Sequence, residues 1–328
     1  MEQKCETGII ASWMLGWTWE CSLIHAGKRA CAAALLLVLQ IMAGNTAAVA
    51  ADEVSAPAKG VPGWAVRLRP TPVVNGAPIL LRVKPPMRLK SLQGTWLGHD
   101  VSFDFDSSTR TWYGLAGASL KTHPGSYPLA LNAESISGKT LSFERKIHVG
   151  HAKYPSIAIN VPKRYTEPDP AQVEKIKQDQ ALKESLFPKS GPEREWSGRF
   201  LPPVDAPISD HFGTERKLNG VTQSTHQGLD YRVPAGTPIA ALNRGTVLLA
   251  RPLFFEGNCV VVDHGQGLLS LYLHLSEITV KEGDQVTGGK QIGLSGATGR
   301  ATGAHLHVAV RWQGVYLNPS TLFALRLP

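Results

Sequence analysis

Two histidines, His305 and His307, stand two residues apart in the otherwise apolar segment Ala304–Val308. In an extended strand, residues two apart project from the same face, so both imidazoles could lie within reach of one metal ion. Elsewhere the chain supplies His226 and, four residues later, Asp230, a nitrogen and an oxygen donor. Two histidines and one carboxylate form a ligand set of catalytic zinc, which leaves one position open for water. An isolated histidine pair in a strand is more often structural, so the surrounding sequence must support this hypothesis.

The sequence around these histidines favours a β-rich domain that could position them. Glycines recur between Ser295 and Gly303, directly before His305, and permit a tight turn ahead of the strand. Another histidine, His274, follows an apolar run. Apolar runs separated by glycine-rich turns predict strands at 238–241, 245–250, 259–263 and 269–273. We therefore expect residues 204–328 to form a mostly antiparallel β domain.

Several short motifs follow one another in this C-terminal region. They are Phe212-Gly213-Thr214-Glu215-Arg216, His226-x-x-x-Asp230, Tyr272-x-His274-Leu275 and His305-x-His307, and Leu317-Asn318-Pro319 lies near the end. In this order they resemble the motifs of the lysostaphin-type (LytM-type) zinc metallopeptidases, a family that cuts peptide bonds in bacterial cell walls. Val308 departs from the family pattern, where Phe is usual, and this change should affect packing rather than ligation.

The resemblance implies a role for each polar residue of the motifs. It makes His226, Asp230 and His307 the ligands of one zinc ion per chain, with water as the fourth ligand. It leaves His305 unligated and pairs it with His274 as the two catalytic histidines, one as base and one as oxyanion stabiliser, in an order that stays open. Zinc would lower the pKa of its water and polarise the scissile carbonyl. Because the chain has no H-E-x-x-H glutamate, a histidine must act as the base.

The function that the resemblance implies is that of an exported zinc metalloendopeptidase. Its substrate would be the stem or cross-bridge peptides of peptidoglycan, which is the expected partner. A second possibility is a non-enzymatic relative that binds the wall or activates a separate amidase, although such relatives typically lose ligands and this chain keeps all of them. A third is a zinc peptidase that acts on glycine-rich proteins, since fold alone does not fix the substrate.

The first 50 residues are typical of an export signal. Lys28 and Arg29 precede an apolar run from Ala30 to Gly44, and Ala48-Val49-Ala50 is a small-residue cleavage pattern. An uncleaved membrane anchor is the alternative, but the strongly apolar part is short for a span of about 20 residues. We expect residues 1–50 to be a signal peptide and residues 51–61 a linker. The mature protein would lie in the periplasm, in the cell envelope or outside the cell, without stable membrane insertion.

Charge and cysteine content agree with export. The chain of 328 residues has a formal net charge of +8, which suits an anionic partner such as peptidoglycan. Nucleic acid is the generic alternative, but export and the lack of basic runs with interleaved aromatic residues argue against it. Three of the four cysteines fall in the presequence. Cys259 remains in an apolar run, where we expect a buried small hydrophobe rather than a disulfide or a metal ligand.

Residues 62–150 alternate in hydrophobicity as half-buried strands do. Val101, Phe103 and Phe105 are separated by polar residues, a period-two pattern. Further runs, divided by turn signals, predict strands at 65–68, 79–83, 127–131 and 141–149. The strand spacing and the length of the segment predict an immunoglobulin-like β-sandwich domain. Surface or turn positions are expected for His99, His123 and His148 of this segment and for His151 directly after it.

Residues 151–203 are expected to link the two domains and to contain one short helix. Asp169-Pro170 is typical of a helix start, with a capping residue followed by proline at the first helical position. Apolar residues from Val173 to Leu186 form a partial stripe that ends before Pro188. The helix could strap the domains together or serve as a solvated spacer. The fold class predicted for the whole chain is predominantly all-β.

Further expectations concern four polar residues. Arg216 and Asn219 precede the first ligand and could contact substrate carboxylates. His264 lies in a hairpin turn signal, Asp263-His264-Gly265, and is expected to face solvent. His211 precedes a turn and is given no role.

Overall fold

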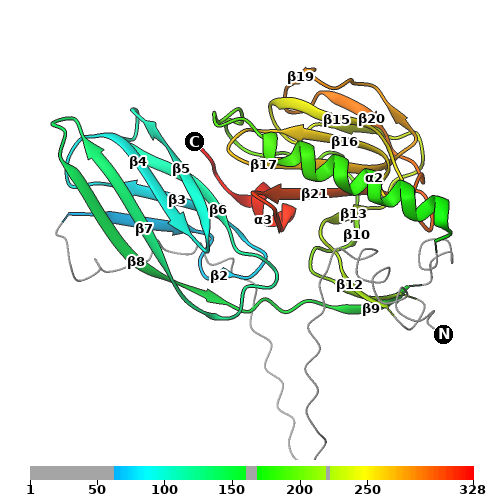
Figure 1. Ribbon diagram of the computed structural model, residues 1–328, viewed down its shortest axis with the longest axis horizontal. Coiled ribbons are helices and arrows are strands. Elements are labelled where there is room, and N and C mark those ends of the chain that lie inside the picture. The colour runs from blue at the N-terminus through cyan, green and yellow to red at the C-terminus, as the bar shows by residue number, and fades with distance from the viewer. Residues whose placement is uncertain (1–62, 160–167, 219–221) are drawn as a thin grey trace, which may run out of the picture. The chain divides into compact units, whose positions relative to one another are not determined.

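A computed structural model describes residues 63–159, 168–218 and 222–328. The predicted signal peptide (1–50), the predicted linker (51–61) and Asn219 lie outside the described residues. Strands dominate, and the α-helices described are α2 (Pro170–Leu186) and α3 (Pro319–Ala324) (Figure 1). Both described helices are too short or too polar to cross a membrane. The predicted fold class, predominantly all-β, is confirmed.

The first eight strands form one sheet in the order β1-β3-β6-β5-β4-β7-β8-β2. The bounds are Ala65–Arg69 (β1), Val73–Val74 (β2), Pro78–Lys84 (β3), Leu89–Trp96 (β4), His99–Asp106 (β5), Thr111–Gly117 (β6), Gly125–Ser135 (β7) and Thr140–Gly150 (β8). Strand β5 joins the two halves, because its first residues pair with β4 and its last residues pair with β6. The four predicted runs lie within β1, β3, β7 and β8, while the immunoglobulin-like assignment and the boundaries at 62 and 150 stay predictions.

The alternation predicted for β5 holds only in its first half. Val101 and Phe103 are buried, but the Phe105 side chain is 52% exposed. The strand leaves β4 after Ser102 and continues beside β6 alone. Phe105 therefore lines an open groove together with Trp112, at 5.3 Å between ring centroids, instead of entering the core. Surface positions are found for His123, His148 and His151, and His99 is half-buried.

The C-terminal region is built on a second sheet, in the order β10-β13-β21-β17-β16-β15-β19, with β22 beside β21. The bounds are Ile208–Asp210 (β10), Leu229–Tyr231 (β13), Gly245–Leu253 (β15), Gly257–Asp263 (β16), Leu268–Leu275 (β17), Gln285–Val286 (β19), Leu306–Trp312 (β21) and Val315–Leu317 (β22). The pairs that the structure describes in this sheet are antiparallel, as predicted. Cys259 is buried in β16, also as predicted.

Two small sheets flank this one. The first has the order β12-β11-β9 and the second β14-β20-β18. Their bounds are Ser156–Ile159 (β9), Glu215–Leu218 (β11), Thr222–Thr225 (β12), Pro238–Ala240 (β14), Glu277–Ile278 (β18) and Gln291–Leu294 (β20). Strand β9 comes from the predicted linker and runs parallel to β11, so the linker contributes to the C-terminal fold.

Helix α2 is fastened to the second sheet rather than being a solvated spacer. It begins, as predicted, at Asp169, whose side chain accepts from the Gln172 backbone in a capping box. The buried carboxylate of Asp179 accepts from the backbone nitrogen of Phe254 at 2.7 Å, and Lys183 pairs with Glu256 at 2.6 Å. Because residues 254 and 256 form the turn between β15 and β16, the helix holds this hairpin in place (Figure 1).

The expectation for His264 was wrong, because its side chain is fully buried. The segment that follows α2 covers the turn, where the Glu195 nitrogen donates to the His264 carbonyl. One ring nitrogen, Nδ1, lies 2.7 Å from the Arg244 carbonyl and the other, Nε2, lies 2.8 Å from the Ser270 hydroxyl. Burial lowers the pKa of His264 to about 4, so the ring is neutral at neutral pH.

We expect His264 to make the folded state sensitive to acid. Its ordinary pKa is 6.5 and its folded pKa is about 4, so the unfolded chain binds this proton first as the pH falls. The free energy of unfolding is therefore not reduced by His264 above pH 6.5. It falls as the pH drops towards 4 and below, by up to about 3 kcal/mol. Denaturant unfolding of the wild type and His264→Gln between pH 7.5 and 4 measures the difference. A wild type that loses no more stability than the variant over this range would contradict the assignment.

Candidate metal centre and active site

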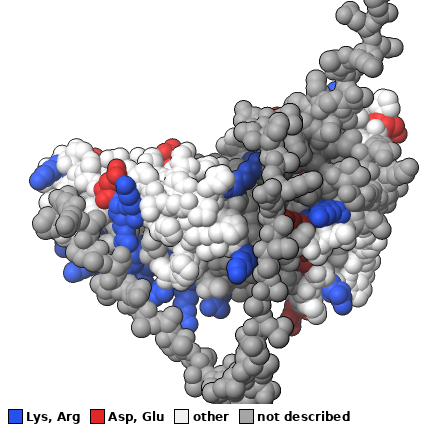
Figure 2. Space-filling view, turned by 90° about the horizontal axis from the view of Figure 1, so that it is seen from below, with Lys and Arg blue, Asp and Glu red and all other residues white. Residues whose placement is uncertain are grey.

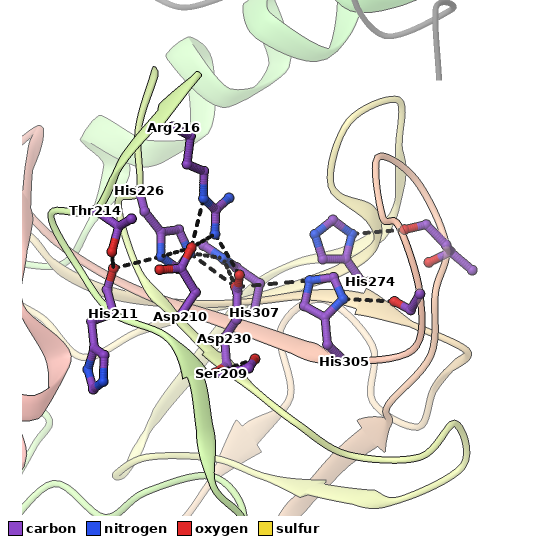
Figure 3. A network of polar contacts seen from close by, with 12 residues as sticks. Ser209, Asp210, His211, Thr214, Arg216, His226, Asp230, His274, His305 and His307 are labelled. Atoms are coloured by element: carbon purple, nitrogen blue, oxygen red, sulfur yellow. Dashed lines mark hydrogen bonds and ion pairs between the residues drawn. The ribbon is translucent and has the colours of Figure 1, made fainter. Parts of the chain in front are cut away.

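Three side chains from separate elements converge on one point (Figure 3). Asp230 lies in β13 directly opposite His307 of β21, and His226 lies in the loop before β13. The Nε2 atom of His226 is 3.1 Å from Asp230 Oδ1 and 3.0 Å from His307 Nδ1, and His307 Nδ1 is 2.7 Å from the same oxygen. Among the described residues, this is the group of His, Cys, Asp and Glu side chains that could hold a metal ion.

The turn that contains Phe212-Gly213-Thr214 orients His226. The Gly213 nitrogen donates to the His226 carbonyl, and the His226 nitrogen donates to the Thr214 carbonyl, both at 2.8 Å. On the side chain, Nδ1 lies 2.9 Å from the carbonyl oxygen of His211. A carbonyl only accepts, so Nδ1 carries the proton and Nε2 presents its lone pair to the centre. His211 thus acts through its backbone, while its own side chain is exposed.

Arg216 is paired with protein carboxylates, in contrast to its expected contact with substrate. Its Nη2 lies 2.6 Å from Asp230 Oδ2, and its Nε lies 2.8 Å from Asp210 Oδ2. Asp210, in β10, is a member of the centre that the sequence analysis missed. Its position two residues before the Phe212-Gly213 turn is a signal that could have marked it as a candidate site residue. Burial would raise the pKa of Asp230, but hydrogen bonds with His226 and His307 outweigh it and hold the pKa well below its ordinary value.

His274 and His305 lie beside this centre, with ring centroids 4.8 Å apart. Nδ1 of His274 bonds the Thr298 carbonyl at 2.8 Å, and Nδ1 of His305 bonds the Gly303 carbonyl at 2.9 Å. Each ring therefore has Nε2 available, and the Nε2 of His305 lies 4.0 Å from Asp230 Oδ1. Burial, with repulsion from His307 and His305, lowers the pKa of His274 to about 3, so this ring is neutral at neutral pH.

The backbone at His274 is held by neighbouring loops. Its φ of +64° lies in the left-handed region, which is uncommon outside glycine. The His274 nitrogen donates to the Glu256 carbonyl at 2.8 Å. Thr298 Oγ1 donates to the Leu275 carbonyl at 2.7 Å and accepts from the Asn258 nitrogen at 2.9 Å. The glycine-rich turn and the β15–β16 hairpin, which α2 holds, thus fix this histidine together.

The donor set fits a divalent metal ion. Two imidazole nitrogens and a carboxylate oxygen lie within 3.1 Å of one another, and His226 and Asp230 are buried. Two nitrogens and one oxygen at such spacing match the ligands that zinc takes in catalytic sites. The structure thus brings together the three predicted ligands and places both predicted catalytic histidines next to them. The roles of all five residues stay predictions.

Comparison with known proteins places this arrangement in a family. Residues 224–319 match peptidase family M23. A crystal structure from Pseudomonas aeruginosa, assigned to peptidase M23, is 31% identical and superposes with a TM-score of 0.59 over 76% of this chain and 94% of that chain. The chain belongs to peptidase family M23. The resemblance to LytM-type peptidases is therefore confirmed, and all five predicted site residues lie in the matched segment.

Curated relatives match this chain only in part of their length. Peptidoglycan DD-endopeptidase ShyA of Vibrio cholerae is 43% identical over 120 residues, which are 35% of this chain and 28% of that protein. DD-carboxypeptidase/endopeptidase Mpg of Neisseria meningitidis serogroup B is 40% identical over 118 residues, 36% of this chain and 27% of that protein. The chain thus spans less than a third of the length of these curated relatives.

Gly228, between two predicted ligands, allows β13 to approach β21 closely. A Cβ atom at this position would lie 2.6 Å from His307 Nε2 and would also meet the Val308 carbonyl oxygen. We expect Gly228→Ala to displace His307 and weaken metal binding by at least tenfold, as loss of a supporting contact does. Gly191→Ala, where a Cβ meets no atom within 4 Å, is the control. Competition with a fluorescent zinc chelator measures the zinc affinity of both variants. Equal affinities would show that the close approach at Gly228 does not position His307.

Proposed function

We propose that this M23 chain is an exported zinc metalloendopeptidase that hydrolyses peptide bonds in the stem or cross-bridge peptides of peptidoglycan. The observation that carries the proposal is the convergence of His226, Asp230 and His307 beside the His274–His305 pair. The peptidoglycan endopeptidases among the relatives support the substrate class. Export is proposed from the signal-like residues 1–50, and the domains from the predicted boundaries 62–150 and 204–328.

In the proposed mechanism, His226, Asp230 and His307 hold one zinc ion. The ion, when bound, supplies an acidified water and polarises the scissile carbonyl. Asp230 stays ionised beside Arg216, whose contact with Oδ2 fixes the carboxylate so that Oδ1 faces both imidazoles. Asp210 also pairs with Arg216, so the guanidinium does not fully neutralise the negative charge of the Asp230 carboxylate.

The second part of the proposed mechanism is proton transfer by His274 and His305. A neutral imidazole with its Nδ1 proton on a carbonyl can accept a proton at Nε2 and pass it to the leaving amine. His274, whose Nδ1 lies on the Thr298 carbonyl, presents its Nε2 in this way. A histidine that carries a proton at Nε2 can also donate to the oxyanion that forms during attack. The presence of both histidines favours catalysis over the alternative of a non-enzymatic wall-binding or amidase-activating protein.

Digestion of purified peptidoglycan by the zinc-loaded full chain tests this function. We expect new amino groups at one defined position of the stem or cross-bridge peptide, detected by mass spectrometry of the released fragments. A chelator should abolish their release, and added zinc should restore it. A zinc-loaded protein that releases no amine from peptidoglycan would contradict the proposal, as would one that cuts only glycine-rich proteins.

Single substitutions separate the proposed ligand from the proposed catalytic histidines. We expect His307→Ala to lose zinc and activity together, because it removes a ligand. His305→Ala should keep zinc but slow turnover by about two to four orders of magnitude. His274→Asn should behave like His305→Ala, and Asn is chosen because it tolerates a positive φ. Zinc content by mass spectrometry and kcat measure the two effects.

The matched control for these variants is His211→Ala. It removes an exposed imidazole near the centre and keeps the carbonyl that orients His226, so zinc content and kcat should stay at the wild-type level. Retention of zinc by His307→Ala with loss from His305→Ala would mean that the roles of the pair are reversed. Full activity in both would place the active site elsewhere.

A further inference from the structure

A groove on the first sheet, remote in sequence from the metal centre, combines apolar and cationic side chains. Its volume is about 610 Å³. The lining residues come from the segment after β3, the β5–β6 hairpin and the β7–β8 turn: Lys84, Met87, Arg88, Phe105, Arg110 and Ile136 are those used below. None of the lining residues belongs to the proposed metal centre, so the groove is a separate feature.

The apolar part of the groove is unusually exposed. Met87, Phe105 and Ile136 are 40%, 52% and 67% exposed, although large apolar side chains are ordinarily buried. Phe105 rests on Trp112, which is almost buried, and the two rings form a tilted pair. The exposed ring of Phe105, supported by Trp112, offers a face for the C–H groups of a sugar ring or for an apolar chain.

The cationic part consists of Lys84, Arg88 and Arg110, which are all exposed. None of the three has an ion-pair partner within the described part of the chain, and none of the lining residues is acidic. Arg110 has a φ of +50°, in a hairpin whose turn is fixed by Asp106 through Ser108 and Thr109. The hairpin thus places the guanidinium of Arg110 at the groove. The backbone of Arg110 has a positive φ there, which asparagine or glycine adopts more readily. Figure 2 shows one face of the molecule, on which Lys and Arg side chains are more frequent than Asp and Glu.

We propose that this groove binds an anionic glycan-peptide strand, with a sugar face on the exposed ring of Phe105 and carboxylates on Lys84, Arg88 and Arg110. Guanidinium groups bind carboxylates through paired, charge-assisted hydrogen bonds. The concave shape and the hydroxyls of Ser107 and Thr109 in the lining suit a polar polymer better than a flat lipid surface. The inference rests on the proposed function in one respect, because the strand is then uncleaved peptidoglycan bound at residues that do not belong to the metal centre.

The test compares the wild type, two groove variants and one control variant, all as zinc-loaded full chains. Arg88→Gln/Arg110→Asn removes two charges, and Asn suits the positive φ at position 110. Phe105→Ala removes the exposed ring. Arg67→Gln/Lys146→Gln removes two exposed charges of the same sheet that do not line the groove.

Cosedimentation with insoluble peptidoglycan on ice measures binding, and turnover of a soluble cross-linked peptide without glycan measures chemistry. We expect each groove variant to bind peptidoglycan about tenfold more weakly, while the control binds as the wild type does. Added salt should weaken wild-type binding more than that of Arg88→Gln/Arg110→Asn. Turnover of the glycan-free peptide should be equal in all four proteins.

Two outcomes would overturn the inference. The first is wild-type binding of peptidoglycan by both groove variants. The second is groove-dependent binding to phosphatidylglycerol vesicles with none to peptidoglycan, which would make the occupant a lipid. Failure of the proposed function looks different: no protein would cut the peptide, yet groove-dependent binding to peptidoglycan would remain.

Discussion

The contact on which the site depends is that of one carboxylate oxygen, Asp230 Oδ1, with two imidazole nitrogens. The other oxygen, Oδ2, is held by Arg216, so the carboxylate cannot rotate away from His226 and His307. This geometry requires the register in which Asp230 of β13 stands opposite His307 of β21. A slip of one residue would turn His307 to the other face of the sheet. The apolar residues that alternate with it, Leu306 and Val308, are fully buried and stabilise this register.

The other parts of the C-terminal fold supply carbonyl groups at fixed positions. The carbonyls of His211, Thr298 and Gly303 each accept from the Nδ1 of a different histidine, so three imidazoles have Nε2 available for chemistry. These carbonyls belong to loops, which need support from regular structure. The Phe212-Gly213 turn supports the first, and the β15–β16 hairpin supports the second through Asn258. Because α2 is bonded to the same hairpin through Asp179 and Lys183, the linker contributes to the order of the candidate site.

The sequence predicted those features that depend on local spacing. Two-residue spacing in an apolar strand predicted the shared face of His305 and His307, whose rings both lie within 4.0 Å of Asp230 Oδ1, and the cap at Asp169 predicted the start of α2. Features that depend on distant segments escaped prediction. His264 is buried because the segment after α2 covers its turn, and Asp210 joins the centre because β10 pairs with β13 and places it opposite Asp230. No local sequence pattern predicts the burial of His264 or the position of Asp210.

The exposure of Phe105 has a similar origin, since period-two alternation reports which side chains share a face and not whether another layer covers that face. Strand β5 changes partners along its length, and the alternation therefore continues past the core. The resulting groove could not have been predicted from alternation alone, because its lining residues come from three separate hairpins or turns.

X-ray absorption spectroscopy at the zinc edge of the zinc-loaded full chain tests the central claim most directly. The account predicts two histidine nitrogens and one or two oxygens at about 2.0–2.2 Å, without sulfur. His307→Ala, which should lose the ion, should give no zinc-edge signal above that of free zinc. A shell of oxygens alone, or a sulfur shell at about 2.3 Å from Cys259, would show that the ion binds elsewhere and would contradict the assignment of His226, Asp230 and His307.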